Sequence, residues 1–251
     1  MASSRVANGL LWGTIGANIY VFGRWHSFIP DAQAAKAGPQ SQAYQQAKDK
    51  HIRYMHENYT LSRKNVAEGR WWTLLTSALS HKDLVHLGVN MMVLHTTVRI
   101  GFSHLIGLGP LQMGTLAVGS ALCGSLGSLY DYGKAAEAGM GEGSGLGASG
   151  MVQGIMVATA LAVPRLPMQL FPIPIPMPYW VLVGGFVGYD MYRLYEQRAS
   201  GRRRQNWMGA YVGYAAHLGG AAFGAAFYFL AMRRGMVVRR DALRRMIQRR
   251  P

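Results

Sequence analysis

The sequence predicts an all-α integral membrane protein, a six-helix bundle with a long first loop. Half of its 251 residues are hydrophobic, and its basic residues gather in the connections and at the C-terminal end. Stretches with almost no charge separate them, at residues 83–98, 105–130, 143–164, 166–189 and 205–232. Apolar spans that alternate with basic connections are typical of multi-pass membrane proteins. A net charge of +15 placed in this way favours a lipid bilayer as partner over nucleic acid, and it disfavours a soluble protein with solvated tails.

Six stretches are expected to form the spans: residues 8–29, 82–99, 103–130, 149–163, 179–196 and 208–232. Asn18 and Arg24 interrupt the first, so a signal peptide or a mitochondrial presequence stays open as an alternative to a retained helix. The fourth stops before Pro164, so it is shorter than the roughly 20 residues that cross the hydrocarbon. We therefore expect one end of the fourth helix to lie below the membrane surface.

Four regions follow from this pattern. They are an N-terminal region with the first helix (1–30), a long and partly interfacial first loop (31–80), a core with helices two to six (81–232) and a basic tail (233–251). Within the loop, residues 41–59 are rich in Ala, Gln, Lys and Tyr, which indicates a surface or interfacial helix. Cys123 is the only cysteine, so no internal disulfide holds the fold together.

Polar residues of different spans are expected to meet on one side of the membrane. Successive spans alternate in direction, so helices two, four and six begin on the same face. His86 and Asn90 lie in the first turns of helix two, and Ser149 begins helix four. His217 lies about 13 Å into helix six, because each helical residue rises about 1.5 Å. A fourth helix that begins below the surface brings Ser149 to a similar depth, and polar groups inside a membrane usually mark function or face the bundle interior.

These residue types suit nucleophilic catalysis. A serine attacks only when a base takes its proton, and a neutral histidine such as His217 is suited to that task near pH 7. The backbone N–H of Ser149 is unpaired at a helix start, and His86 and Asn90 share one helical face, so the three are candidate oxyanion donors. The acidic candidate at this depth is Asp190, which we expect to pair with Arg193, leaving a Ser–His dyad. We expect no metal and no cofactor.

Two pairs of glycines favour close contact between helices four and six. Gly150 and Gly154 are four residues apart, as are Gly220 and Gly224. Small residues at this spacing allow two helix backbones to approach closely in lipid. Generic helix packing explains these glycines equally well.

Three motifs, taken together and in this order, resemble those of the rhomboid family of intramembrane serine proteases. Gly147-Ala148-Ser149-Gly150 is similar to the G-x-S-G motif of the family. Ala216-His217-Leu218-Gly219-Gly220, with Gly224 further on, is similar to A-H-x-x-G-x-x-x-G. His81, His86 and Asn90 match H-x-x-x-x-H-x-x-x-N, and the resemblance extends from about residue 69 to residue 224.

The resemblance implies a six-helix bundle with a water-filled site open to one side, which cleaves transmembrane protein substrates. By the same resemblance Ser149 is the nucleophile, His217 is the base, and His86 and Asn90 act with Ser149 as oxyanion donors. Four further residues would have structural roles near the site: His81, Gly147, Gly150 and Gly220.

Two positions depart from the family pattern. Thr73 follows Trp72 where many rhomboids have an arginine, so the contact between tryptophan and arginine is expected to be absent or rearranged, with Arg70 as the nearest arginine. Gln153 stands where many rhomboids have an aromatic residue that stacks on the histidine, so a less constrained His217 is expected. The second departure keeps one alternative open, a catalytically inactive rhomboid-like protein that binds transmembrane helices. A small transporter or channel is disfavoured, because ionisable residues are not spread through several helices.

Charge also suggests an orientation. Six spans place both termini on one side, and the basic tail favours the cytosol or the matrix there when the long first loop is discounted. The site is then expected to open towards the other side. The basic composition and Arg5 favour a mitochondrial inner membrane, with a bacterial plasma membrane or a secretory membrane as alternatives. The sequence predicts neither the identity of the substrate nor the oligomeric state.

Overall fold

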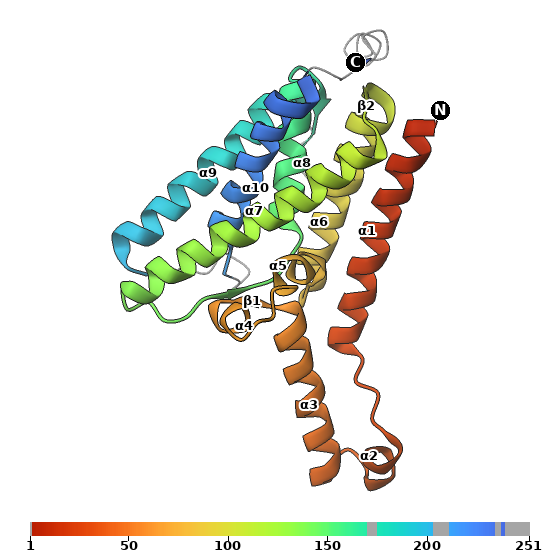
Figure 1. Ribbon diagram of the computed structural model, residues 1–251, viewed down its shortest axis with the longest axis vertical. Helices are drawn as coiled ribbons and strands as arrows, with labels where there is room; N and C mark the ends of the chain where they lie inside the picture. The colour runs from red at the N-terminus through yellow and green to blue at the C-terminus, as the bar shows by residue number, and fades with distance from the viewer. Residues whose placement is uncertain (1, 170–174, 203–210, 234–236, 239–251) are drawn as a thin grey trace.

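The chain folds into a helical bundle from which part of the first loop projects (Figure 1). The computed structural model describes residues 2–169, 175–202, 211–233 and 237–238. The structure is 75% helical, which agrees with the expected all-α class. The α-helices are α1 Ala2–His26, α2 Ala32–Ala37, α3 Gln42–Tyr59, α4 Arg63–Ala67, α5 Thr73–Thr76, α6 Leu84–Thr96, α7 Pro110–Glu137, α8 Ser149–Ala162, α9 Tyr179–Ser200 and α10 Tyr214–Phe227. A short 3₁₀ helix, η1, covers Ser77–Leu79, and the π-helices η2 (Thr97–Leu105) and η3 (Tyr228–Met232) extend α6 and α10.

Short antiparallel strand pairs fasten the connections together. The pairs are β1 Leu61–Ser62 with β3 Ser144–Gly145, β2 Ile106–Gly107 with β6 Val237–Val238, and β4 Pro167–Met168 with β5 Met177–Pro178. Each strand has two residues, so these pairs act as local clips between loops. The first of these strand pairs lies next to the site, because it fixes the glycine-rich loop before α8 against residues 61–62 of the first loop.

Helix direction alternates along the bundle as the sequence pattern requires. In Figure 1, α6, α8 and α10 begin towards the end of the molecule where α5 and β1 lie, and they run towards the end where the N-terminus and β2 lie. The helices α1, α7 and α9 run the opposite way. Helix α10 packs against α7, α8 and α9, and α1 packs against α6, η2 and α7.

Helix two is longer than predicted, and helix three begins later. Residues 103–105 were expected to open helix three, but they belong to η2, which continues α6 to Leu105. Helix α7 begins only at Pro110, which follows the N-cap residue Gly109. Proline is well suited to the first turn of a helix, because its missing N–H would have no partner within the helix there. It then continues to Glu137, beyond the expected end near residue 130.

The first helix runs through both residues that were expected to interrupt it. Asn18 is completely buried, and its side-chain amide donates to the carbonyl oxygen of Thr14 at 2.9 Å. This bond to the preceding turn satisfies the amide donor without opening the helix. Arg24 lies in the last turn of α1, where a cation interacts favourably with the helix dipole.

The helices differ in whether their length and hydropathy suffice to cross a membrane. Within the described residues, Tyr214–Met232 is the one helix that is both long and apolar enough to cross a membrane by itself, and Ser149–Ala162 is apolar but shorter. The count of six spans therefore stays a prediction. Residues 170–174 of the proline-rich link, residues 208–210 of the expected sixth helix and most of the basic tail lie outside the described residues.

The first loop contains the helix expected near residues 41–59. Ser41 caps α3, accepting a hydrogen bond from the backbone of Tyr44 at 3.1 Å. Figure 1 shows α2 and α3 extending away from the bundle at the end opposite the N-terminus. Whether α3 lies at a membrane surface stays a prediction.

Candidate active site

The four predicted catalytic and oxyanion-hole residues line one cavity, together with Gly147 and Gly150. It has a volume of about 630 Å³, and His86, Asn90, Ser149 and His217 are all part of its wall. These residues come from α6, α8 and α10, the three helices that begin at the same end of the bundle. The fold therefore brings together side chains that are 131 residues apart in sequence, from His86 to His217.

Ser149 is the first residue of α8, and its position depends on the turn before it. Gly147 has a φ of +132°, a conformation that disfavours residues with a side chain. A β-carbon at Gly147 would lie 2.7 Å from a ring carbon of His86. The Gly147 N–H donates to the carbonyl oxygen of Ser77 at 2.8 Å, so the turn is fixed to the end of the first loop. The first backbone N–H groups of a helix such as α8 have no partner within the helix, so they are available to bind an anionic group.

His81 supports the same turn from beneath. Its side chain is completely buried, and its Nε2 atom accepts a hydrogen bond from the Ala148 N–H at 3.3 Å. Burial, followed by the nearby His86, lowers the pKa of His81 from 6.5 to about 3. The ring is therefore neutral at physiological pH and can act as the acceptor that this backbone donor needs.

Helices α8 and α10 are in backbone contact, as their glycines predicted. A β-carbon at Gly220 would overlap the carbonyl oxygen of Gly150, and one at Gly224 would overlap that of Gly154. A β-carbon at Gly150 would lie 3.0 Å from the carbonyl oxygen of Ala216, the residue before His217. The missing side chains thus set the spacing between the helix that carries Ser149 and the helix that carries His217.

Asp190 contacts His217 and not Arg193, so the expected pairing is wrong. The Asp190 Oδ2 atom lies 3.0 Å from His217 Nδ1, and the Asp190 residue is 6% exposed. Arg193 instead forms an ion pair with Glu196 at 2.7 Å and donates to the Tyr214 hydroxyl at 3.3 Å. Arg193 and Glu196 are one helical turn apart, so α9 satisfies its own basic residue locally.

The histidine is more restrained than the sequence indicated. Besides its bond to Asp190, the His217 ring meets the Tyr214 ring edge-on, with 6.4 Å between the ring centroids. Gln153 is buried in α8, and its side-chain nitrogen has no hydrogen-bond partner among the described residues. Asp190 and Tyr214 therefore supply the restraint on His217 for which the sequence offered no aromatic residue at position 153.

Asn90 is buried on α6 one turn after His86. Its amide donates to the carbonyl oxygen of His86 at 2.9 Å. A side-chain amide carries two N–H groups, so one remains for a second acceptor. Both residues line the cavity, so α6 contributes two side chains with N–H groups to the cavity wall.

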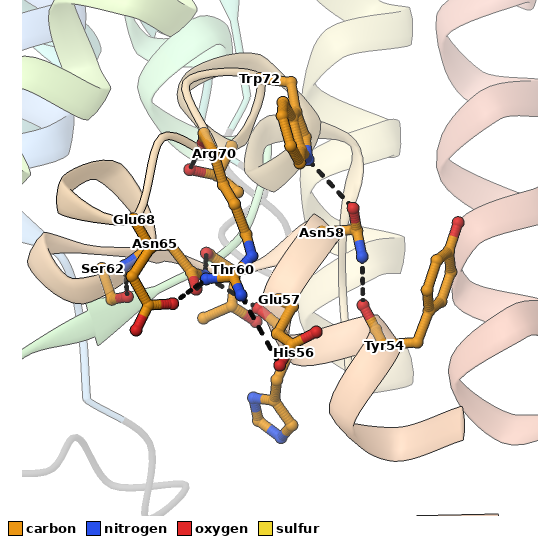
Figure 2. Close-up of polar contacts among 11 residues, drawn as sticks. Tyr54, His56, Glu57, Asn58, Thr60, Ser62, Asn65, Glu68, Arg70 and Trp72 are labelled. Atoms are coloured by element: carbon orange, nitrogen blue, oxygen red, sulfur yellow. Dashed lines mark hydrogen bonds and ion pairs between the residues drawn. The ribbon is translucent and has the colours of Figure 1, made fainter. Parts of the chain in front are cut away.

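The first loop replaces the tryptophan–arginine contact with a different network (Figure 2). The Trp72 ring nitrogen donates to the Asn58 side chain at 3.1 Å. Arg70 turns the other way, bonding to Asn65 at 3.2 Å and to Glu68, and it lies 3.8 Å from Glu57. Trp72 and Arg70 thus bond to different partners, in agreement with the expectation that the tryptophan–arginine contact is absent or rearranged.

Thr73 occupies the arginine position of the family pattern in a buried role. Its side chain is completely buried, and its hydroxyl donates to the Arg70 carbonyl oxygen at 2.7 Å. The next residue of α5, Leu74, accepts a hydrogen bond at its carbonyl oxygen from Ser125 of α7 at 2.7 Å. The end of the first loop is therefore anchored to the bundle next to the cavity.

Sequence reasoning considered Asp190 and set it aside, and it missed Tyr214 and Ser77. The signal for Asp190 was present, because an acid in an apolar helix needs a polar partner. No sequence signal identified Ser77, since its contribution to the turn before Ser149 is a backbone carbonyl.

Comparisons with known proteins agree with the motifs and the fold. The rhomboid domain model matches residues 68–234, a range that contains His86, Asn90, Ser149 and His217. The chain is 34% identical over 194 residues to RHOMBOID-like protein 12, mitochondrial, from Arabidopsis thaliana, covering 72% of this chain and 52% of that protein. It is 30% identical over 218 residues to Rhomboid protein 1, mitochondrial, from Saccharomyces cerevisiae, covering 87% of this chain and 52% of that protein. The chain thus spans about half the length of these curated relatives. The family model covers well over half of the chain, and by this match the protein belongs to the rhomboid family.

Proposed function

We propose that this chain is an intramembrane serine endopeptidase that cleaves transmembrane or membrane-anchored protein substrates. The observation that carries the proposal is the shared cavity, whose wall contains Ser149, His217, His86 and Asn90. A serine, a histidine and two further donors around one space are the parts that peptide hydrolysis by acyl transfer requires.

The reaction begins with a proton transfer. As the Ser149 oxygen bonds to the carbonyl carbon of the substrate, its proton passes to Nε2 of His217. The carbonyl oxygen becomes an oxyanion, and the tetrahedral intermediate then collapses with cleavage of the C–N bond. The His217 proton passes to the leaving amine, and water hydrolyses the resulting ester by the same steps.

The oxyanion is stabilised from two sides. The N–H of Ser149 at the start of α8 provides one donor, and His86 and Asn90 on α6 provide the others. Removing a single oxyanion donor of this kind typically costs about 10²- to 10³-fold in kcat, so these residues are expected to matter for the rate more than for substrate binding.

The membrane setting is part of the same proposal. We place six helices across the bilayer, with α3 at its surface and the cavity opening away from the side of the two termini. The names of both relatives include the word mitochondrial, which supports a mitochondrial membrane for this chain, and its basic composition favours the inner one. A protease-protection assay on sealed vesicles tests the orientation, and a C-terminal tail on the same side as the first loop contradicts it.

Activity-probe labelling tests the chemistry directly. A fluorophosphonate should label the wild-type protein and fail to label Ser149→Ala and His217→Ala. Ser27→Ala and His95→Ala are suitable controls, since Ser27 is exposed after α1 and neither residue lines the cavity. Both controls should be labelled like the wild type. The inactive, helix-binding alternative predicts instead that no variant is labelled and that a transmembrane peptide still binds.

A further inference from the structure

We propose that Asp190 is a positioning residue that holds the His217 ring so that its Nε2 atom faces Ser149. This inference rests on the proposed serine protease function and extends it from a dyad to three residues in line. The carboxylate lies on α9 and the histidine on α10, 27 residues later in the sequence, and the two groups are 3.0 Å apart.

The geometry assigns the proton on the histidine ring. A carboxylate can only accept, so a hydrogen bond at Nδ1 requires that Nδ1 carries the proton. The neutral ring then has its lone pair on Nε2, which is the atom that must take the serine proton. If Nδ1 had no fixed acceptor, the other tautomer would place a proton on Nε2 and block that step.

The carboxylate also suits the charge that develops during the reaction. When the Ser149 proton reaches Nε2, the ring becomes an imidazolium between the serine oxygen and Asp190. The Asp190 carboxylate accepts the Nδ1–H bond and stabilises this cation at short range. Its side chain is only 8% exposed, so water screens the attraction weakly.

The surrounding residues leave Asp190 available for this role. Arg193, one turn further along α9, is paired with Glu196 and with the Tyr214 hydroxyl. The Tyr214 ring lies edge-on to His217 and limits rotation of the imidazole. Because Arg193 is paired with other groups, the buried Asp190 carboxylate is available to hydrogen-bond to His217.

Kinetics of three Asp190 variants separate positioning from simple helix packing. The side chain of Asp190→Asn has nearly the same shape and can still form a hydrogen bond, so the variant should unfold at a temperature close to that of the wild type. We expect its kcat to fall between about 10² and 10⁴-fold with little change in KM, as expected for removal of an orienting carboxylate. Asp190→Glu should retain part of the activity, and Asp190→Ala should lose both activity and stability. Glu137→Gln is a matched control, because it removes an exposed carboxylate on α7 that pairs with Lys134 at 2.9 Å.

A purely structural role gives a different pattern. If Asp190 only joins α9 to α10, Asp190→Asn should cleave substrate within about threefold of the wild-type rate, a change below 1 kcal/mol, and the inference is wrong. Failure of the proposed function looks different again, because the wild type itself would then neither cleave nor be labelled.

A measurement on the wild-type protein avoids any dependence on variant folding. With ¹⁵N-labelled histidine, the His217 signals should show a proton on Nδ1 and none on Nε2, and His217→Gln assigns them. Finding the proton on Nε2 in the resting enzyme would overturn the proposal.

Discussion

Gly220 of α10 packs directly on the backbone of Gly150 in α8, with no room for a side chain between them. Gly150 follows the proposed nucleophile, and Gly220 lies three residues after the proposed base. The contact between these two glycines therefore helps to set the separation of Ser149 and His217. The glycine motif of α10 thus has a role in helix packing, which is separate from any role in the reaction.

Gly220→Ala should therefore impair folding and activity together. A methyl group at this position overlaps the Gly150 carbonyl oxygen, and overpacking of this kind typically costs about 1 to 3 kcal/mol. The thermal unfolding temperature in detergent and the extent of fluorophosphonate labelling should both be lower than for the wild type.

A matched glycine on α9 supplies the control. Gly184 has open space where its β-carbon would lie, so Gly184→Ala should be neutral or stabilising by about 0.5 to 1 kcal/mol. Equal effects of the two substitutions would show that helix propensity, and not contact between α8 and α10, determines the result.

His81 should make stability depend on pH. Its pKa in the folded protein is about 3 and its ordinary value is 6.5, so the unfolded chain binds a proton in this interval that the folded chain does not. The contribution is fully present above pH 6.5 and falls as the pH is lowered towards 3. From pH 6.5 to about pH 5 the free energy of unfolding should drop by roughly 2 kcal/mol from this group alone.

Comparing His81→Gln with the wild type isolates the contribution of His81 to the pH dependence of stability. The variant should unfold more easily above pH 6.5, because a flexible amide replaces a completely buried ring, but its stability should decline less on acidification. His51→Gln, a substitution in α3 away from the cavity, should retain the wild-type slope. An unchanged slope in His81→Gln would contradict the neutral, buried state of this ring.

The two proposed oxyanion donors on α6 should affect turnover selectively. His86→Ala and Asn90→Ala are each expected to lower kcat by about 10² to 10³-fold while KM changes little. His95→Ala, on the same helix but packed against Trp12 with 5.5 Å between ring centroids, should leave kcat unchanged. Steady-state cleavage of a transmembrane peptide gives both constants, and a rise in KM alone would assign these residues to substrate binding.

In the first loop, a buried amide should matter more than an exposed ion pair. Asn65 is 7% exposed and donates to the carbonyl oxygens of His56 and Thr60 at 3.0 and 2.7 Å. Asn65→Ala leaves both acceptors unpaired and should cost about 2 kcal/mol or more. Arg70→Ala removes partly exposed ion pairs, each worth about 0 to 1 kcal/mol, and should cost less.

Thermal unfolding and limited proteolysis of the first loop measure this order. Lys48→Ala on the exposed side of α3 serves as the baseline. If Arg70→Ala proved the more damaging substitution, the network in Figure 2 would depend on charge and not on the Asn65 amide.

Much of the site was readable from local sequence. The proline at position 164 and the glycine-rich run before Ser149 predicted a short α8 with the serine at its start, because proline and glycine act on their immediate neighbours. Helix bounds were less predictable where two apolar stretches adjoin. Residues 103–105 joined the end of helix two, since apolar character does not distinguish a helix end from the next beginning.

The sequence by itself determined the helical class, the order of the motifs and the helix on which each polar residue lies, because these depend on periodicity and short-range spacing. Only the tertiary structure decided which side chains meet across helices. Asp190 had a candidate partner three residues away in Arg193, yet it contacts His217 on the next helix. That choice depends on how α9 and α10 are rotated against each other. Close packing of residues far apart in the sequence sets this rotation, and local spacing carries no record of it.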